Sequence, residues 1–484
     1  MGIFLYCTNL GNIYLWQDEA QTALISQTIL QDGVPRGYDG RNFFSQELGA
    51  EYGENYIFKW HTWLPFYIVA AFFKIFGKNT FTARLPFALF GLGSVFFLYY
   101  LTKSIFRNNR EAYMAALVLL MSIPFIILSR QCRYYSMAAF FSLMTVFGYQ
   151  AILMKNKKGP FVYFAGATFL FHTQYVYVAT MFAALVLHLL IFNRDRWRNF
   201  LLPTLAVLVV NSPWIIWLSG MKYGEQYGET FFTLQPFIFK ITSFSKDIAR
   251  FIFQPLLLII PLAVFLYRLL LKKVTELPTR NFLSGASLAI FYIASTLVAL
   301  SLAAPAPFFR YLAPLIPFFA MLIGIIFAYA MRIHVAAGVV LIGAIIVFSP
   351  IREYFFELSH DYNGPMEGIV NYLNEHADKN DIVAITYGDM PVKFYTGLRV
   401  VGGLTGEDLT PAKDADWVII RNHVISAKDF MVRNFLMRNV KWRNYQRIVL
   451  DYPDTPFENR ESPDEHLFRT ATDYPPVVLY KKIR

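Results

Sequence analysis

Long apolar runs alternate with short polar segments along most of the chain. Between residues 82 and 348 these runs carry almost no charge, and most reach the roughly 18 residues that a helix needs to cross a bilayer. The pattern predicts an α-helical polytopic membrane protein with about ten to eleven transmembrane helices. The predicted spans are residues 82–102, 112–129, 133–154, 161–172, 175–192, 200–219, 251–271, 282–303, 310–330 and 335–350.

Clusters of lysine and arginine between the runs set the predicted orientation. Short loops rich in these residues lie on the cytoplasmic side of a membrane, and two apolar runs separate each cluster here from the next. The opposite, extracytoplasmic side then carries a first outer loop over residues 11–81 and everything after residue 350. The clusters are Lys103/Arg107/Arg110, Lys155/Lys157/Lys158, Arg194/Arg196/Arg198, Lys272/Lys273/Arg280 and Arg332.

Two apolar segments near the N-terminus do not fit a complete span. Residues 64–76 are too short to cross and have both ends outside, so we predict a helix lying in the outer interface. Residues 1–10 give half a span at best, although an outer loop that begins so early needs a helix before it. We therefore expect a longer reading frame that completes this first helix.

The composition changes after residue 350, which divides the chain into a transmembrane domain, residues 1–350, and a small α/β extracytoplasmic domain, residues 351–484. The tail mixes charges with alternating strand and helix patterns. Asp389, His423 and His466 are scattered in it and are interpreted as surface or structural groups. The predicted elements are helices over 365–376 and 428–438 and strands over 381–386, 416–420 and 477–483.

The composition supports a membrane protein. Hydrophobic residues make up 56% of the 484 and charged residues 16%, against about 45–50% and about 25% in soluble domains. The net charge of +11 sits between apolar runs, so lipid headgroups rather than nucleic acid are the expected counterions. Cys7 and Cys132 match no metal-binding or disulfide spacing.

Polar groups gather at the outer ends of the predicted spans. No Asp or Glu falls inside a predicted span, which weighs against an ion-coupled transporter. Asp18 and Glu19 begin a helix that stops at Gly33, so they are either its N-cap and first-turn acid or a base facing a cavity at the membrane surface.

Arginines at the same level suit a lipid phosphate. Arg130, Arg133 and Tyr134 are spaced i, i+3 and i+4, and Arg310 with Tyr311 begins another span. A guanidinium can bind two phosphate oxygens at once. The alternative is that these arginines only anchor helix ends at the interface.

Several motifs, in order, resemble the GT-C superfamily of lipid-linked-sugar-dependent glycosyltransferases, in particular the branch of protein O-mannosyltransferases and lipid A aminoarabinose transferases. The match covers most of the chain. The motifs are WQDEA, FKWHTWLPFYIVAAFFKIFG, NTFTARLPFALFGLGSVFFLYYL, SRQCRYYSMAAFF, FHTQYVYV, NSPWIIWL and FFRYLAPLIP.

The resemblance implies a hexosyl- or pentosyltransferase that moves a sugar from a polyprenyl phosphate to an acceptor glycan, lipid or protein outside the cytoplasm, usually with inversion. It implies that Asp18 is the catalytic base, with Glu19 beside it to orient it or to assist a metal. The residues it places at the donor phosphate are Lys59, His61, Arg130, Arg133, Tyr135 and Arg310. Further candidates for lining the site are Arg84, His172, Tyr175 and Tyr311.

The chain departs from the family pattern at two points. The family often has His or Lys followed by two prolines before the interfacial helix, whereas His61 is followed by Thr-Trp-Leu-Pro, which leaves the phosphate role open between Lys59 and His61. Some relatives carry an acid where this chain has Cys132 to Tyr134.

The sequence leaves open whether a metal ion is bound and which class of function the protein has. A divalent metal ion would need Asp18, Glu19 and His172 to come together. A flippase or transporter of lipid-linked sugars and a non-catalytic assembly protein are the alternative functions. A bacterial cell membrane is the expected location.

Overall fold

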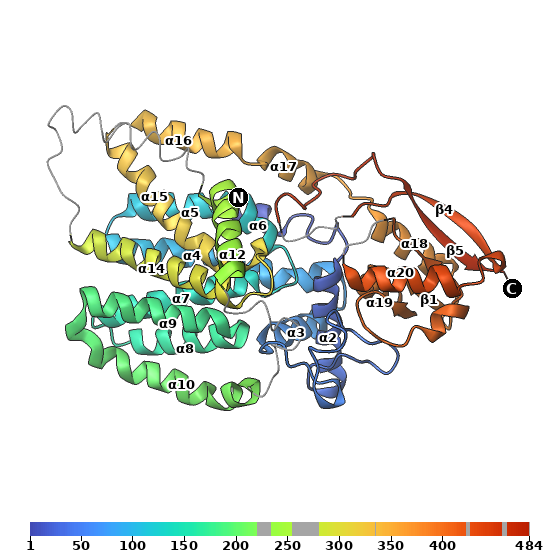
Figure 1. Ribbon diagram of the computed structural model, residues 1–484. Coiled ribbons are helices and arrows are strands. Elements are labelled where there is room, and N and C mark those ends of the chain that lie inside the picture. The colour runs from blue at the N-terminus through green and yellow to red at the C-terminus, as the bar shows by residue number, and fades with distance from the viewer. Residues whose placement is uncertain (220–233, 254–279, 334, 423–425, 457–461, 484) are drawn as a thin grey trace.

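A helical bundle, an α/β domain and a connecting layer make up the computed structural model (Figure 1). Helices α2 and α3 lie between the bundle and the α/β domain. The structure describes residues 1–219, 234–253, 280–333, 335–422, 426–456 and 462–483.

Helices long and apolar enough to cross a membrane number six in the described residues, or up to eight if each of two bent pairs forms one span. The multi-pass prediction is confirmed, and the predicted span over 251–271 lies mostly outside the described residues. The bundle helices are α4 (Thr80–Phe106), α5 (Asn109–Leu120), α6 (Ile123–Ser129), α7 (Tyr135–Leu153), α8 (Gly159–Thr173), α9 (Tyr175–Phe192), α10 (Trp197–Ser219), α12 (Leu234–Asp247), α14 (Arg280–Ala303), α15 (Ile316–Ile333) and α16 (Val335–Phe348).

The predicted span over 112–129 is broken in the middle. Helix α5 ends at Leu120, and α6 starts at Ile123 with an axis bent by 62° from that of α5. Pro124 lies in the first turn of α6, where a proline is tolerated because its missing N–H has no helical partner. The break leaves the end of α6, and therefore Arg130, next to the start of the chain.

The predicted interfacial helix is confirmed as a helix by α3 (Leu64–Phe76). Phe66, Val69 and Phe73 are buried on one side, whereas Ile75 and Phe76 are exposed. Gly77, at φ 82°, ends the helix in a conformation that side chains rarely adopt. Its 13 residues leave it shorter than a span.

Helix α2 (Gln17–Asp32) begins two residues earlier than an N-cap at Asp18 requires. Trp16 is the N-cap, so the interpretation of Asp18 as the N-cap is wrong. Glu19 sits at the third helical position, and its carboxylate accepts a hydrogen bond from the Trp16 N–H at 3.3 Å, as in a capping box. Asp18 is therefore not needed to cap the helix.

The segment between α2 and α3 is ordered by a buried carboxylate. Glu51 accepts hydrogen bonds from Gln46 N at 2.6 Å, Ser45 Oγ at 2.8 Å and Gln21 Nε2 at 3.1 Å. Burial raises the pKa of Glu51 above its ordinary value, while these donors oppose the shift. The contact with Gln21 ties the segment between α2 and α3 to α2.

The α/β domain contains a mixed sheet of five strands in the order β2-β1-β3-β5-β4. Strands β2, β1 and β3 are parallel, with Ile382 opposite Arg399 and Val383 opposite Trp417, and β5 is antiparallel to both β3 and β4. Its elements are α17 (Ile351–Ser359), α18 (Pro365–His376), β1 (Ile382–Ile385), α19 (Asp389–Thr396), β2 (Arg399–Gly402), β3 (Trp417–Ile419), α20 (Ala427–Asn439), β4 (Tyr445–Pro453) and β5 (Pro476–Lys482).

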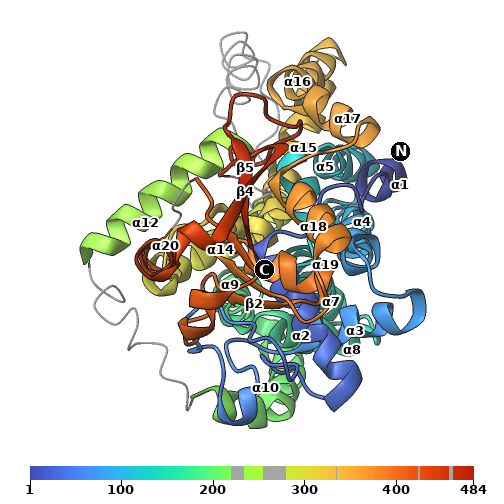
Figure 2. The ribbon, with the colours of Figure 1, turned by 90° about the vertical axis from the view of Figure 1, so that its right-hand side faces the viewer.

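Both faces of this sheet are covered. Alternate strand residues pack with Ile369 and Leu373 of α18 on one side, and with Val432 and Leu436 of α20 on the other. The five elements predicted here are confirmed within one or two residues at each end, whereas α17, α19, β2 and β4 had no predicted counterpart. Viewed from the side of this domain, its elements lie in front of the end of the helical bundle (Figure 2).

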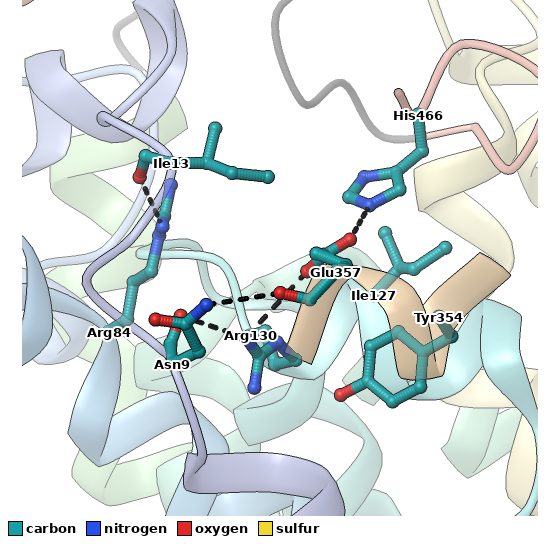
Figure 3. A pocket seen from close by; sticks show the side chains of 8 residues that line it. All are labelled: Asn9, Ile13, Arg84, Ile127, Arg130, Tyr354, Glu357 and His466. Atoms are coloured by element: carbon teal, nitrogen blue, oxygen red, sulfur yellow. Dashed lines mark hydrogen bonds and ion pairs between the residues drawn. The ribbon is translucent and has the colours of Figure 1, made fainter. Parts of the chain in front are cut away.

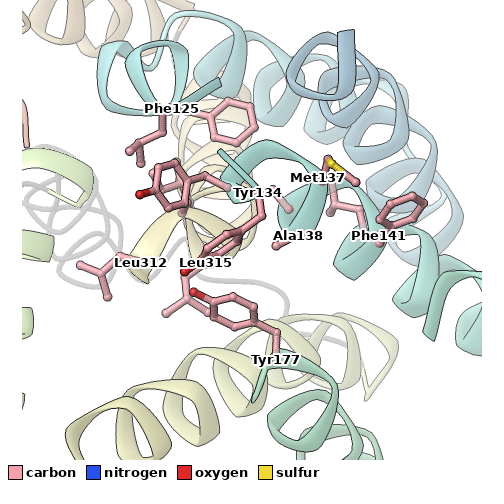
Figure 4. Packing of buried hydrophobic residues seen from close by; sticks show 14 of the residues in the cluster. Phe125, Tyr134, Met137, Ala138, Phe141, Tyr177, Leu312 and Leu315 are labelled. Carbon is pink, nitrogen blue, oxygen red and sulfur yellow. The ribbon is translucent and has the colours of Figure 1, made fainter. Parts of the chain in front are cut away.

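Large buried side chains fill the bundle beneath α2. The side chains of Tyr134, Met137 and Phe141, from the start of α7, pack in one cluster with Leu312 and Leu315 and with Tyr177 of α9 (Figure 4). Tyr177 also donates a hydrogen bond to the Tyr311 carbonyl at 3.0 Å. This packing fixes the backbone on both sides of Arg133 and Arg310.

Candidate active site

An acidic side chain and two arginines from three separate segments meet above this packed layer. Arg310, in the short helical segment Phe309–Leu315, donates to Asp18 Oδ2 at 3.0 Å. Arg133, just before α7, approaches the same oxygen at 3.5 Å and donates to Thr22 Oγ1 at 3.0 Å. The structure therefore brings together three residues that the sequence predicted to share a site.

This cluster is only partly covered. The side chains of Asp18, Arg133 and Arg310 keep 12%, 14% and 14% of their surface exposed. Their formal charges sum to one positive unit, and the Arg310 guanidinium lies 4.4 Å from the ring centre of Phe308 and 5.8 Å from that of Trp16. An anion that reaches the cluster meets two guanidiniums on an apolar aromatic background, where charges interact more strongly than in bulk water.

Glu19 lies in a different environment from that of Asp18. Its side chain is fully buried, and Arg84 of α4 donates to its two oxygens at 2.8 and 2.6 Å. The Cys132 N–H donates to Glu19 at 2.6 Å, and Arg84 also binds the carbonyls of residues 10, 13 and 14. Glu19 and Arg84 thus connect α2, α4 and the chain start, and no exposed surface is left on the Glu19 side chain.

Arg130 is directed away from Asp18. It donates to the carbonyls of residues 6, 8 and 9 and lies 3.7 Å from the Glu357 carboxylate, which also binds His466. Figure 3 shows Glu357 between Arg130 and His466 in a small pocket. The structure therefore does not place Arg130 with the other predicted phosphate ligands; it joins the bundle to the tail domain.

Lys59 and His61 flank Trp60 in the segment just before α3. The His61 ring stacks on Phe66 and lies 5.9 Å from the Tyr134 ring, with Nδ1 2.8 Å from the Thr62 carbonyl. Burial lowers the pKa of His61 to about 3, with a further contribution from Arg133. His61 is therefore a neutral hydrogen-bonding group near the cluster at physiological pH, whereas the ammonium of Lys59 lies 5.6 Å from the Trp217 ring centre.

The remaining predicted residues divide between the cluster and its surroundings. Tyr135 is fully buried at the start of α7, and within the described part of the chain its hydroxyl has no hydrogen-bond partner. The Tyr311 ring lies 5.7 Å from the Arg310 guanidinium. His172, at the end of α8, packs edge-on against Trp214, and Tyr175 begins α9 near Phe171.

A protein metal site does not form from the predicted ligands. Across the described ranges, no group of three or more His, Cys, Asp and Glu side chains lies close enough to hold a metal ion, so Asp18, Glu19 and His172 are not brought together. The Glu19 carboxylate is already occupied by Arg84. We therefore assign no step of the chemistry to a protein-held metal.

The sequence did not single out the contacts that hold the tail domain on α2. Asp389 and Lys393, both fully buried, form an ion pair at 2.8 Å, and Gln17 donates to Asp389 at 2.7 Å. Asp389 is thus a buried structural group rather than a surface one. Its i, i+4 spacing from Lys393, among apolar neighbours, was the available signal.

Comparison with known proteins gives one family match. Residues 60–217 match the model of the dolichyl-phosphate-mannose-protein mannosyltransferase family, which is about a third of the chain. The matched range contains α3 to α9 and all but the end of α10, with Lys59 just before it and Asp18 and Arg310 outside it. No curated protein sequence matches the chain.

Solved structures resemble the whole chain at low sequence identity. ArnT from Cupriavidus metallidurans bound to undecaprenyl phosphate has a TM-score of 0.60 and 13% identity, over 99% of this chain and 96% of that one. The archaeal oligosaccharyltransferase AglB from Archaeoglobus fulgidus, in complex with an inhibitory peptide and a dolichol-phosphate, has a TM-score of 0.54 and 10% identity, over 92% and 71%.

A third structure extends this set. The arabinofuranosyltransferase AftD from Mycobacteria has a TM-score of 0.51 and 13% identity, over 100% of this chain and 41% of that one. At these identities the likeness establishes the fold, and the family match adds a relationship in sequence. Together they confirm the predicted resemblance: the chain has the ArnT-like fold of a multi-pass membrane protein, and residues 60–217 match the mannosyltransferase family in sequence.

Proposed function

We propose that the chain is a glycosyltransferase that moves a sugar from a polyprenyl-phosphate donor to an acceptor hydroxyl or amine. The observation that carries the proposal is the partly exposed Asp18 carboxylate held between Arg133 and Arg310. The match to a family named for a dolichyl-phosphate-mannose donor supports it, as does a fold shared with an ArnT that binds undecaprenyl phosphate.

The two guanidiniums suit the leaving group. When the bond between the sugar C1 and the phosphate oxygen breaks, its electron pair stays on the phosphate, which gains negative charge. Arg133 and Arg310 would meet that charge with planar donors at a site of low dielectric. Arg130, bound to backbone carbonyls and close to Glu357, has no part in this step.

Asp18 serves as the general base. The acceptor atom forms a new bond to C1 and its proton passes to the Asp18 carboxylate, so the acceptor gains the sugar and the phosphate leaves. Both ion pairs of Asp18 are made through Oδ2. Attack from the side opposite the phosphate inverts the configuration at C1.

The proposed location is a cell membrane, with the site and the tail domain extracytoplasmic. The Asp18 cluster lies at the end of the bundle that carries the tail domain, where Thr80 at the start of α4 bonds Tyr395 at 2.6 Å. The basic residues Lys103 and Arg107 lie at the other end of α4, which suits the cytoplasmic side. No observation on the described residues favours transport of lipid-linked sugars.

Transfer of label from a panel of polyprenyl-phosphate sugars to membrane extract, using the purified chain in liposomes, tests this function. We expect labelled acceptor and free polyprenyl phosphate with at least one donor. Consumption of no donor by folded protein, together with movement of labelled lipid between leaflets, would replace the proposal with transport.

A further inference from the structure

The carboxyl ends of the parallel strands in the tail domain face α2. In open α/β sheets, ligands bind beyond the carboxyl ends of the parallel strands. Here the segments that follow β1 and β2 meet the first outer loop instead. Asp389 follows β1, and Gly406, after β2, lies so close to Leu48 that an added Cβ would come within 2.8 Å of the Leu48 backbone.

A buried ion pair at this edge binds the residue directly before Asp18. Gln17 Nε2 donates to Asp389 Oδ1 at 2.7 Å, and the Met390 N–H approaches Gln17 Oε1 at 3.4 Å. Lys393 donates to Asp389 Oδ2 and to the Phe43 carbonyl, both at 2.8 Å. Gln17, Asp389 and Lys393 are 1%, 0% and 2% exposed, so water does not compete for these bonds.

The same domain holds the backbone that enters α2. The Tyr14 N–H donates to Glu367 at 2.7 Å, and the Leu15 N–H donates to the Tyr395 hydroxyl at 2.9 Å. The rings of Tyr14 and Tyr395 stack with their centres 4.1 Å apart. Residues 14, 15 and 17 are therefore each fixed by the tail domain immediately before the proposed base.

A buried ion pair often stabilises a contact between domains no better than an apolar pair of similar volume, because both ions lose their hydration. Stability alone therefore does not explain the Asp389–Lys393 pair. It does fix direction, since Lys393 restrains one Asp389 oxygen and leaves the other aimed at Gln17. A displacement of about 1 Å at a reacting group can cost on the order of 100-fold in rate.

We propose that Asp389 is a positioning residue, which acts through Gln17 to hold the Asp18 carboxylate in line with the acceptor. The inference rests on the proposed function of Asp18. The tail domain then contributes to the reaction indirectly. It fixes the position of the base but provides no group that touches the substrate.

Asn42 offers a matched control. Like Gln17, it is a buried carboxamide that makes two bonds to the tail domain, donating to the Leu398 carbonyl at 2.9 Å and accepting from the Val400 N–H at 2.9 Å. It belongs to the segment between α2 and α3 rather than to α2. Asn42→Ala therefore removes a similar contact between the domains without touching the residue before Asp18.

The test compares Gln17→Ala and Asn42→Ala for turnover per folded molecule, donor KM and thermal unfolding in detergent. Gln17→Ala is preferred to Asp389→Asn because it leaves the Asp389–Lys393 pair intact and adds no unpaired buried charge. We expect both variants to lose similar stability. Gln17→Ala should also lose roughly tenfold or more in kcat with donor KM unchanged, whereas Asn42→Ala should keep wild-type kcat.

Two other outcomes have distinct meanings. Equal kcat in the two variants, at equal loss of stability, would reduce Gln17 and Asp389 to structural contacts and overturn the inference while leaving the glycosyltransferase proposal in place. A wild-type protein that transfers no sugar from any donor would overturn the proposed function, and the inference with it.

Discussion

Two neighbouring acids in one helical turn have opposite environments. Asp18 is partly exposed and shares two arginines that come from distant segments, whereas Glu19 is fully buried against a single arginine and two backbone N–H groups. The sequence placed them together as a catalytic pair. The difference shows how two adjacent carboxylates can have separate roles. Glu19, whose hydrogen bonds are completed within the fold, stabilises the fold, and Asp18, which keeps some exposed surface, is suited to chemistry.

The same contrast separates the arginines. Arg310 and Arg133 approach the Asp18 carboxylate. Arg84 and Arg130 instead bind backbone carbonyls and lie against buried glutamates. The sequence predicted Arg130 and Arg133 to lie at the same depth in the membrane, and both are arginines. What distinguishes them is the break between α6 and α7, which turns Arg130 and Arg133 towards different neighbours.

The largest expected effect is on transfer by the Asp18→Asn variant. The amide keeps the shape of the side chain and removes the base, so kcat should fall by roughly 10²- to 10⁴-fold. Thermal unfolding should change less than in Glu19→Gln, because Asp18 and its two arginines keep 12–14% of their side-chain surface exposed. Turnover in liposomes, normalised to folded protein, measures this. Full activity of the variant would remove Asp18 from the chemistry.

Glu19→Gln should act mainly on stability. The change leaves Arg84 buried without its counter-ion, and removing one partner of a buried pair costs about 3–5 kcal/mol. Thermal unfolding in detergent should show the loss, with donor KM unchanged in the protein that remains folded. A stable but inactive variant would instead give Glu19 a direct part in catalysis.

A smaller effect separates Arg310 from Arg130. Arg310→Lys replaces the planar fork with a single ammonium, and the loss of a charge-assisted hydrogen bond of about 1.5–3 kcal/mol should raise donor KM by roughly 10-fold or more. Arg130→Lys should lower stability and leave donor KM unchanged. If the two variants raise KM equally, the contrast between the two arginines is wrong.

The smallest effect concerns His61 and pH. Its pKa is about 3 in the folded protein and about 6.5 when unfolded, so the unfolded state binds more protons between these values and stability falls as pH falls. From pH 7 to pH 5.5 the expected loss is about 1 kcal/mol. His61→Asn should flatten this acid limb; an unchanged limb would mean that the ring is not buried as a neutral group.

Much of the fold could be predicted because its signals are local. The apolar runs, the short helix Leu64–Phe76 and the α2 stop at Gly33 depend on hydrophobic length and on a glycine with positive φ. The strands and helices missed in the tail, among them β2 and α19, are short, and their burial comes from contacts distant in sequence.

The site was predictable as a set of residue types but not as a set of partners. Asp18, Arg133 and Arg310 were all named in advance, yet no spacing in the sequence says that Arg130 meets Glu357 or that Gln17 meets Asp389. These pairs join segments more than a hundred residues apart, so they depend on how the tail domain docks on the bundle.

The most direct test of the central claim is single-turnover transfer from one donor by Asp18→Asn and Glu19→Gln, measured side by side per folded molecule. The contrast between the two carboxylates predicts that Asp18→Asn loses transfer with the smaller loss of stability, and that Glu19→Gln keeps transfer with the larger loss of stability. Loss of transfer in Glu19→Gln alone, with Asp18→Asn active, would contradict it.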